Sequence, residues 1–253
     1  MDLTQLLASN SSLSTAIILL GDTQPNSCFN DPKRSNALNI GAVKRIIDTL
    51  NQHEIPILFA SSEFVFDGAK GNYTEEDIPK PILLYGQQKH AVETYLQETT
   101  SNYTIVRLGK IFGSAQGDCT LFTGWAATLN SGKTELTCAT DQRFSPIYIE
   151  DVIKGILVLI KHNCHGIFHL AGPKPYTRRE LLDMVIAEYS RYVPLSIKIT
   201  ACSIHDFDLP EKRPVDVSMA VEKIIKRTRI NFTDTREVCA KIVHDYMTRR
   251  GYT

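Results

Sequence analysis

Short apolar runs rich in β-branched residues alternate with segments of helical periodicity over the first two thirds of the chain. The strand-like runs cover residues 16–20, 57–60, 103–108 and 166–170. Helical spacing covers residues 37–52, 83–98 and 151–162. This alternation is typical of βαβ units, so we predict an α/β fold built on a Rossmann-like, doubly wound parallel sheet.

The last third of the chain has a different pattern. A helical stretch at 176–189 begins with a capping box, in which Thr177 is the N-cap and Glu180 stands three residues on. A turn-rich segment at 209–216 and two further helical stretches follow. This mixture indicates a smaller lobe that packs beside the sheet and closes a cleft.

We therefore predict two parts in the chain. Residues 1–170 form the Rossmann-like core, in which residues 114–145 contribute to the substrate cleft. Residues 171–253 form a small mixed C-terminal lobe that binds substrate.

Composition narrows the class of protein. The 253 residues contain 28 Lys and Arg against 28 Asp and Glu, which excludes a strong attraction to nucleic acid or to an anionic membrane. The longest apolar run, 155–160, is too short to span a bilayer, and a signal peptide is not expected. The six cysteines are scattered without a Cys-x-x-Cys pair, which indicates reduced thiols. We expect a cytoplasmic protein.

Tyr85 and Lys89 are the first candidates for chemistry. Residues four apart share a helix face, so the Lys89 ammonium can lower the pKa of the Tyr85 phenol below its usual value of about 10. Ser62 follows a strand-like run, at the sheet edge where ligands bind, and its hydroxyl can hold a carbonyl oxygen beside the phenol. The three side chains would then deliver a proton during carbonyl reduction. A half-buried tyrosine beside a surface lysine is the alternative interpretation.

A second group of residues has the types that bind metals. His162, Cys164, His165 and His169 lie close together in the sequence. They straddle a helix end and a strand, where alternate side chains point to opposite faces. We therefore predict no metal site.

A longer segment around Tyr85 reads FASSEFVFDGAKGNYTEEDIPKPILLYGQQKHAVE. It resembles the active-site segment of the dTDP-4-dehydrorhamnose reductase family, extended short-chain dehydrogenases/reductases that act on sugar nucleotides. The resemblance continues in VRLGKIFG at 106–113, DQRFSPIYIEDV at 141–152, GIFHLAG at 166–172 and the Arg213-Pro214 pair. These blocks occur in the family's order and cover nearly the whole chain.

The resemblance implies a role for each matching residue of the catalytic group. Tyr85 would be the general acid that protonates the oxygen of the keto sugar. Lys89 would lower the pKa of Tyr85 and hydrogen-bond the nicotinamide ribose, and Ser62 would orient the carbonyl. Ser61, Gly21 and Asn39 would complete the cofactor site, although a helix-packing role suits Asn39 equally well.

The same resemblance implies substrate contacts. Glu63 and Phe64 stand where the family often has Asp-Tyr, so a second phenol is lost here. Arg213 resembles the basic residue near the phosphates of the sugar nucleotide, a role that suits a guanidinium group. Gln142 and Phe144 fall in the block that usually shapes the sugar-nucleotide pocket.

One family feature is not found in the chain. Family members begin with a strand, a Gly-x-x-Gly-x-x-Gly loop and a helix, whose N–H groups cradle pyrophosphate. Here the strand that begins at Ala16 matches the family's fourth, so we expect an N-terminally truncated sheet that lacks the first βαβ unit. Such a sheet exposes an apolar strand edge, which a homo-oligomer or a partner chain would cover.

The resemblance therefore predicts NAD(P)H-dependent reduction of a 4-keto-6-deoxy sugar nucleotide, with NADP or NAD bound weakly or not at all if the glycine loop is missing. The alternative is a non-catalytic sugar-nucleotide-binding or regulatory protein. The DQRFSPIY and EKRPVDVS blocks also resemble the regulatory β subunit of methionine adenosyltransferase. The retained Ser62, Tyr85 and Lys89 favour an enzyme, whereas the missing loop favours a binding role.

Overall fold

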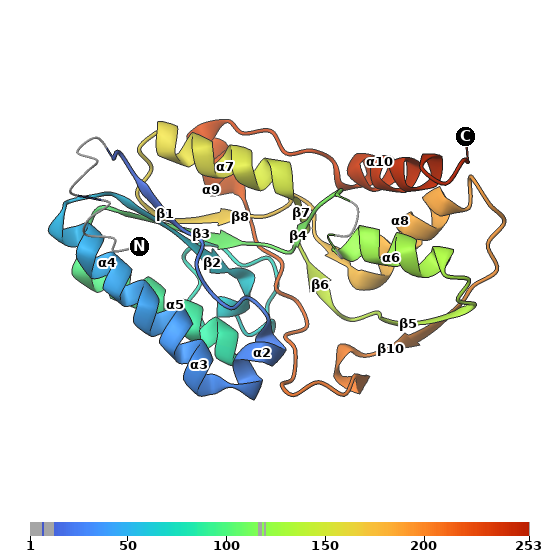
Figure 1. The fold of residues 1–253 in the computed structure, drawn as a ribbon, viewed down its shortest axis with the longest axis horizontal. Coiled ribbons are helices and arrows are strands. Elements are labelled where there is room, and N and C mark those ends of the chain that lie inside the picture. Colours follow the sequence, from blue (N-terminus) through green and yellow to red (C-terminus); the bar gives the residue numbers. More distant parts are fainter. Residues whose placement is uncertain (1–6, 8–12, 116–117, 119, 253) are drawn as a thin grey trace.

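A four-stranded parallel sheet forms the centre of the molecule, in the order β1-β2-β3-β8. The computed structural model describes residues 7, 13–115, 118 and 120–252. The sheet strands are β1 (Ala16–Ile18), β2 (Ile57–Ser62), β3 (Tyr103–Leu108) and β8 (Gly166–Leu170). Helices lie on both faces of this sheet (Figure 1), which confirms the predicted α/β, Rossmann-like fold.

The alternation of side chains along the strands explains the two helical layers. Phe59 and Ile105 point to one face, where they pack against α4 (Val43–Gln52) and α5 (Leu84–Thr99). Their neighbours Leu58 and Val106 point to the opposite face, which is covered by α7 (Ile149–Lys161) and α9 (Glu222–Thr228). Every residue of β2 is buried, as expected for a strand covered on both faces.

The chain between β1 and α4 differs from the prediction. The helix expected at 37–52 begins as a π-helical turn, η1 (Ala37–Ala42), which continues directly into α4. Two short helices precede it, α2 (Pro25–Asn30) and α3 (Pro32–Asn36). Each begins with a proline, a residue whose fixed φ suits the first helical position. Their lengths are too short for hydrophobic periodicity to reveal them.

A second lobe lies beside the carboxyl ends of the strands (Figure 1). It contains the helices α6 (Leu121–Asn130), α8 (Arg178–Tyr189) and α10 (Thr235–Thr248), and the parallel strand pair β5 (Glu135–Ala139) and β10 (Lys198–Cys202). The core of the lobe is apolar and includes Phe122, Leu181, Val185, Val238 and Ile242.

Two small strand pairs join the lobe to the sheet. In the first, β4 (Ile111–Phe112) runs parallel to β7 (Ile147–Tyr148). In the second, β6 (Arg143–Phe144) runs antiparallel to β9 (Tyr176–Thr177). Because β4 follows β3 and β9 follows β8 in the chain, these pairs fix the lobe against the site edge of the sheet.

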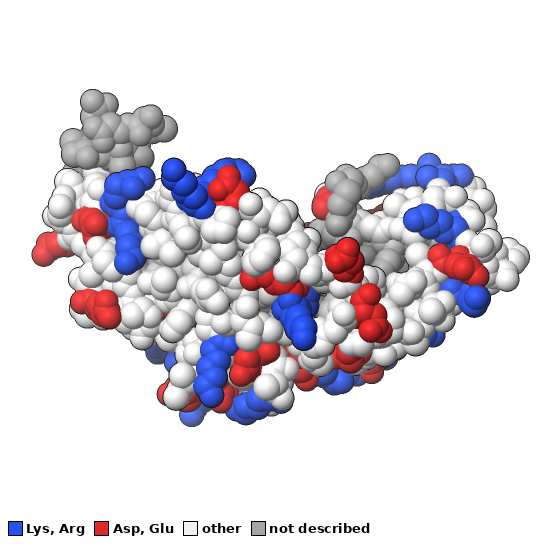
Figure 2. Space-filling view, turned by 90° about the horizontal axis from the view of Figure 1, so that it is seen from below, with Lys and Arg blue, Asp and Glu red and all other residues white. Residues whose placement is uncertain are grey.

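Charged side chains of both signs lie on the surface of the molecule. Figure 2 shows basic and acidic side chains interspersed over the lower face, in keeping with the balanced composition. Among the described strands, β1 pairs with β2 alone, and Ile17 and Leu19 beside this edge are 44% and 61% exposed. In the described part of the chain, no helix has the length and hydrophobicity needed to cross a membrane. Five cysteines are free thiols, and Cys119 lies outside the described residues.

The capping box at the start of α8 is present as predicted. The Thr177 hydroxyl accepts a hydrogen bond from the Glu180 backbone N–H at 3.1 Å, and the Glu180 carboxylate accepts one from the Thr177 N–H at 2.6 Å. Replacing Thr177 with Ala removes the first of these bonds, so we expect a loss of about 1 kcal/mol in the free energy of unfolding. Urea denaturation would measure it, with Thr177→Ser as the control that keeps the cap. Equal stability of the two variants would contradict this role.

Candidate active site

A cleft of about 380 Å³ opens at the carboxyl ends of β2 and β3. This is the edge of a parallel sheet at which ligands bind. Six of the predicted site residues line it: Ser61, Ser62, Glu63, Phe64, Tyr85 and Lys89. The remaining residues of the walls are Leu19, Thr23, Gln24, Pro25, Ala60, Leu108, Gly109, Lys110 and Ile111.

The turn after β2 positions the first group of these side chains. The chain enters a 3₁₀ turn, η2 (Glu63–Val65), in which the Ser62 hydroxyl accepts a hydrogen bond from the Phe64 N–H at 3.2 Å. This cap fixes Ser62 at the end of the strand, with its hydroxyl at the cleft. Glu63 and Phe64 follow on the same turn.

Gly86 lets α5 approach this turn closely. A Cβ atom built on Gly86 would lie 2.0 Å from the Phe64 carbonyl oxygen and 3.0 Å from the Pro81 side chain. A side chain of any size would therefore push the helix away from the turn. The glycine next to Tyr85 thus brings the phenol and Ser62 to the same cleft.

Tyr85 is buried, with 6% of its surface exposed, and its ring meets the edge of Phe64 at a centroid distance of 6.2 Å. Burial raises the pKa of Tyr85 above its ordinary value, and the hydrogen bond with Ser62 acts in the opposite direction. The predicted lowering of this pKa by Lys89 is therefore wrong. Desolvation of the phenolate outweighs the other influences in this site.

Lys89 lies one turn further along α5, on the same face as Tyr85. Its Nζ donates a hydrogen bond to the Ala60 carbonyl at 2.8 Å and stands 5.9 Å from the centre of the Tyr85 ring. The Phe59 ring lies 4.7 Å from the same nitrogen. Burial lowers the pKa of Lys89 to about 8, while Glu93 and Cys28 act to raise it. The ammonium is thus held at the strand end by a carbonyl and an aromatic face.

Glu63 is a buried carboxyl group in the wall of the cleft. It is 4% exposed, and burial raises its pKa to about 8, against the opposing effect of Lys110. Lys110, Thr23, Gln24 and Pro25 also line the cleft but are not among the predicted site residues. Lys110 could have been found from its place just past β3, since residues after neighbouring parallel strands meet at one edge.

Asn39 holds the chain after β1. Its Oδ1 accepts a hydrogen bond from the Asp22 N–H at 2.7 Å, and its Nδ2 donates to the Asp22 carbonyl at 3.0 Å and to Gln88 Oε1 at 2.6 Å. A Cβ atom on Gly21 would lie 3.0 Å from Asn39 Oδ1 and 3.8 Å from Lys89 Nζ. These contacts support the packing role of Asn39, which fixes Gly21 beside the lysine.

Three predicted substrate residues lie outside the cleft wall. Gln142 Oε1 accepts a 3.4 Å hydrogen bond from Arg178, and Phe144 is buried in the apolar core of the lobe. Arg213 donates a hydrogen bond to the side chain of Asn26, which follows the cleft residue Pro25. The arginine thus contacts the residue next to the cleft lining, whereas Gln142 and Phe144 belong to the lobe.

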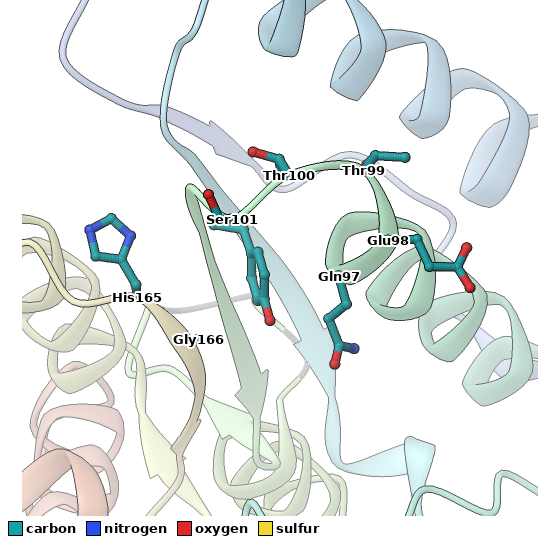
Figure 3. A pocket seen from close by; sticks show the side chains of 8 residues that line it. Gln97, Glu98, Thr99, Thr100, Ser101, His165 and Gly166 are labelled. Atoms are coloured by element: carbon teal, nitrogen blue, oxygen red, sulfur yellow. The ribbon is translucent and has the colours of Figure 1, made fainter.

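A second hollow lies at the opposite edge of the sheet (Figure 3). It has a volume of about 640 Å³ and is formed where the chain enters β3 and β8. His165 stands on one side of it and Gln97, from the end of α5, on the other (Figure 3). Since ligands of parallel sheets bind at the carboxyl ends of the strands, this hollow is not the candidate active site. In the described ranges, His, Cys, Asp and Glu side chains do not form a group of three that could hold a metal ion.

Comparison with known proteins shows the family to which the chain is similar. A family model described as the RmlD substrate binding domain matches residues 19–248. The chain is 24% identical over 235 residues to a protein of Sinorhizobium fredii named dTDP-4-dehydrorhamnose reductase, covering 90% of this chain and 78% of that one. These matches confirm the family resemblance found in the sequence.

Two further similarities bear on function and fold. The chain is 25% identical over 210 residues to methionine adenosyltransferase 2 subunit beta of Rattus norvegicus, covering 79% of this chain but 57% of that one. A dTDP-4-dehydrorhamnose reductase of Bacillus anthracis, solved in complex with NADP, superposes with a TM-score of 0.83 at 18% identity. That superposition covers 96% of this chain and 84% of the other, and it confirms the fold.

The close approach at Gly86 yields a test of the site geometry. Gly86→Ala should displace α5 from the turn after β2 and weaken binding of any ligand that contacts both Ser62 and Tyr85, by about tenfold or more. Gly41→Ala is the matched control, because a Cβ there meets its nearest atom at an ordinary 3.7 Å. Unchanged ligand affinity in a folded Gly86→Ala protein, measured by calorimetry, would show that the close approach does not shape the site.

Proposed function

Because the chain belongs to the RmlD substrate-binding domain family, we propose that it reduces the keto group of a 4-keto-6-deoxy sugar nucleotide with NADPH or NADH. The observation that carries the proposal is that Ser62, Tyr85 and Lys89 line one cleft at the carboxyl ends of β2 and β3. A hydroxyl, a phenol and an ammonium group at one cleft are suited to proton delivery. The reductase name of the Sinorhizobium relative supports the same chemistry.

The residues beside Lys89 fit the nicotinamide half of such a cofactor. One donor of the ammonium group is used by the Ala60 carbonyl, so two remain for the hydroxyl groups of a ribose. Gly21, which has no side chain, leaves space next to the lysine that a Cβ atom would narrow. Lys89, Tyr85, Ser61 and Gly21 would hold this half, which supplies a hydride when bound. The NADP complex of the Bacillus relative supports a nicotinamide dinucleotide.

The surroundings of Tyr85 suit a proton donor. A general acid must hold its proton at working pH, and burial favours the protonated phenol of Tyr85. The Ser62 hydroxyl holds the keto oxygen within reach of this phenol. As the oxygen gains negative charge, Tyr85 passes it a proton, and the nearby Lys89 ammonium stabilises the phenolate that is left.

The remaining predicted contacts belong to the nucleotide end of the substrate. Arg213 contacts Asn26, the residue next to the cleft lining, and its guanidinium group would meet a diphosphate bound there. Gln142 and Phe144 would act by shaping the lobe, in which β6 pairs with β9. A sugar nucleotide bound in this way would touch both the sheet and the lobe.

A second function is favoured by one observation. The chain is 25% identical to methionine adenosyltransferase 2 subunit beta, which is close to its 24% identity to the reductase of Sinorhizobium fredii. In this alternative the cleft binds a sugar nucleotide or a dinucleotide without turnover, as part of a regulatory protein. A reductase binds and converts its keto sugar, whereas a regulatory protein binds its ligand without converting it. Measurements of binding and of turnover therefore distinguish the two functions.

Replacing Tyr85 with Phe tests the reductase proposal. It removes the transferred proton and keeps the ring, so turnover of dTDP-4-dehydrorhamnose, followed by NADPH absorbance, should fall by about 100-fold or more. Calorimetric titration with NADPH, NADH and dTDP-rhamnose should show that Tyr85→Phe still binds the ligands that the original protein binds, because the ring and the other contacts remain. Binding of the sugar nucleotide without any turnover in the original protein would overturn the reductase and favour the regulatory alternative.

The pH dependence of turnover provides an independent test. Burial lowers the pKa of Lys89 to about 8, and the ammonium is the form that stabilises the phenolate. The maximal rate should therefore be retained below this pH and decline as the pH rises through about 8. A rate that stays constant up to the usual lysine pKa of about 10 would show that the charge of Lys89 is not required.

A further inference from the structure

Tyr85, Lys89 and Glu93 form a column on one face of α5, each four residues from the last. The first two residues line the cleft, and the third is fully buried beneath it, with 0% of its surface exposed. A carboxylate is rarely placed in such surroundings unless several groups hold it there. The contacts of Glu93 therefore indicate what it does for the site.

Glu93 is bound from both strands that end at the cleft. Arg107, in β3, donates from Nε to Oε1 at 3.0 Å and from Nη2 to Oε2 at 2.8 Å. Ser61, at the end of β2, donates from its hydroxyl to Oε1 at 2.5 Å. His90 Nδ1 lies 3.8 Å from Oε2. One carboxylate thus joins α5 to β2 and β3.

The burial of this ion pair makes it costly to form and costly to break. Arg107 is 1% exposed, so both charges have lost their hydration, and an apolar pair of similar volume would often stabilise the fold as well. A two-point contact between a guanidinium group and a carboxylate fixes the orientation of both groups. The arrangement therefore favours a positional role over a purely stabilising one.

We propose that Glu93 is a positioning residue of the cleft: anchored by Arg107 and Ser61, it fixes the Tyr85–Lys89 face of α5 against the end of β2 and provides the negative charge beside Lys89. Ser61 directly precedes Ser62, so its hydrogen bond to Glu93 also fixes the strand end that carries the Ser62 hydroxyl. The link to turnover rests on the proposed reductase function, whereas the effect on Lys89 does not.

The charged and titratable groups around Lys89 give the sign of the effect. Glu93 on α5 and Cys28 on α2 both raise the pKa of Lys89, against the lowering by burial. From β2, the lysine meets the Ala60 carbonyl and the Phe59 ring, and Tyr85 lies on its own helix. Removing the Glu93 charge would leave the buried Arg107 cation without its partner, so the pKa of Lys89 should fall.

The test compares four proteins: the original chain, Glu93→Gln, Arg107→Met and the double variant. The protonation of Lys89 is followed in each by NMR of lysine labelled with ¹⁵N, with the signal assigned through Lys89→Arg. In Glu93→Gln the protonation constant of Lys89 should fall roughly threefold or more, because the carboxylate that raises its pKa is gone. In the double variant, which removes both charges, most of this change should be reversed. Asp183→Asn breaks an exposed ion pair with Arg179 on α8 and is the matched control.

The double variant and stability measurements keep the inference falsifiable. If Glu93→Gln does not fold, the double variant still reports on positioning, because turnover should fall through kcat while its urea midpoint stays close to that of the original protein. If the protonation constant of Lys89 and the turnover are both unchanged in folded variants, the inference is overturned. The contact between Glu93 and Arg107 would then be a structural ion pair only. If the original protein turns over no keto sugar, the proposed function fails, but the NMR result still decides the role of Glu93.

Discussion

The buried contact between Glu93 and Arg107 is the interaction on which the site geometry depends. It joins the helix that carries Tyr85 and Lys89 to the two strands whose ends form the cleft. Without a fixed distance between helix and strands, a phenol and a hydroxyl from separate segments would not meet a single carbonyl oxygen. The interior of the sheet thus contains a polar anchor, surrounded by the apolar layers that hold the rest of the fold.

Two local features position the residues that line the cleft. Gly86 allows the first turn of α5 to contact the turn after β2, and the cap on Ser62 fixes the strand end. On the other side, Asn39 holds the chain after β1, so that Gly21 lies next to Lys89. Burial then shifts the protonation equilibria of the two catalytic candidates. It favours a neutral Tyr85 and lowers the pKa of Lys89 to about 8.

Much of this site was predictable because it follows from short-range patterns. The β-branched runs predicted β3 and β8 with the bounds observed, and the four-residue spacing predicted the shared face of Tyr85 and Lys89. The direction of the Tyr85 pKa was not predictable, since it depends on how the helix, the turn and the strand end exclude water together. The Glu93–Arg107 pair was not predictable either, because it depends on which strand lies under α5. The same holds for Lys110, whose place in the cleft depends on the tertiary arrangement of the strands.

We propose that this cleft directs hydride transfer to a keto sugar. The most direct measurement is the transfer of deuterium from NADPH deuterated at nicotinamide C4 to dTDP-4-dehydrorhamnose, with the product examined by NMR. We expect deuterium at C4 of the product sugar, on a single face, because a fixed Ser62 and Tyr85 admit one orientation of the carbonyl. A sugar nucleotide that binds in the cleft but acquires no deuterium would contradict it.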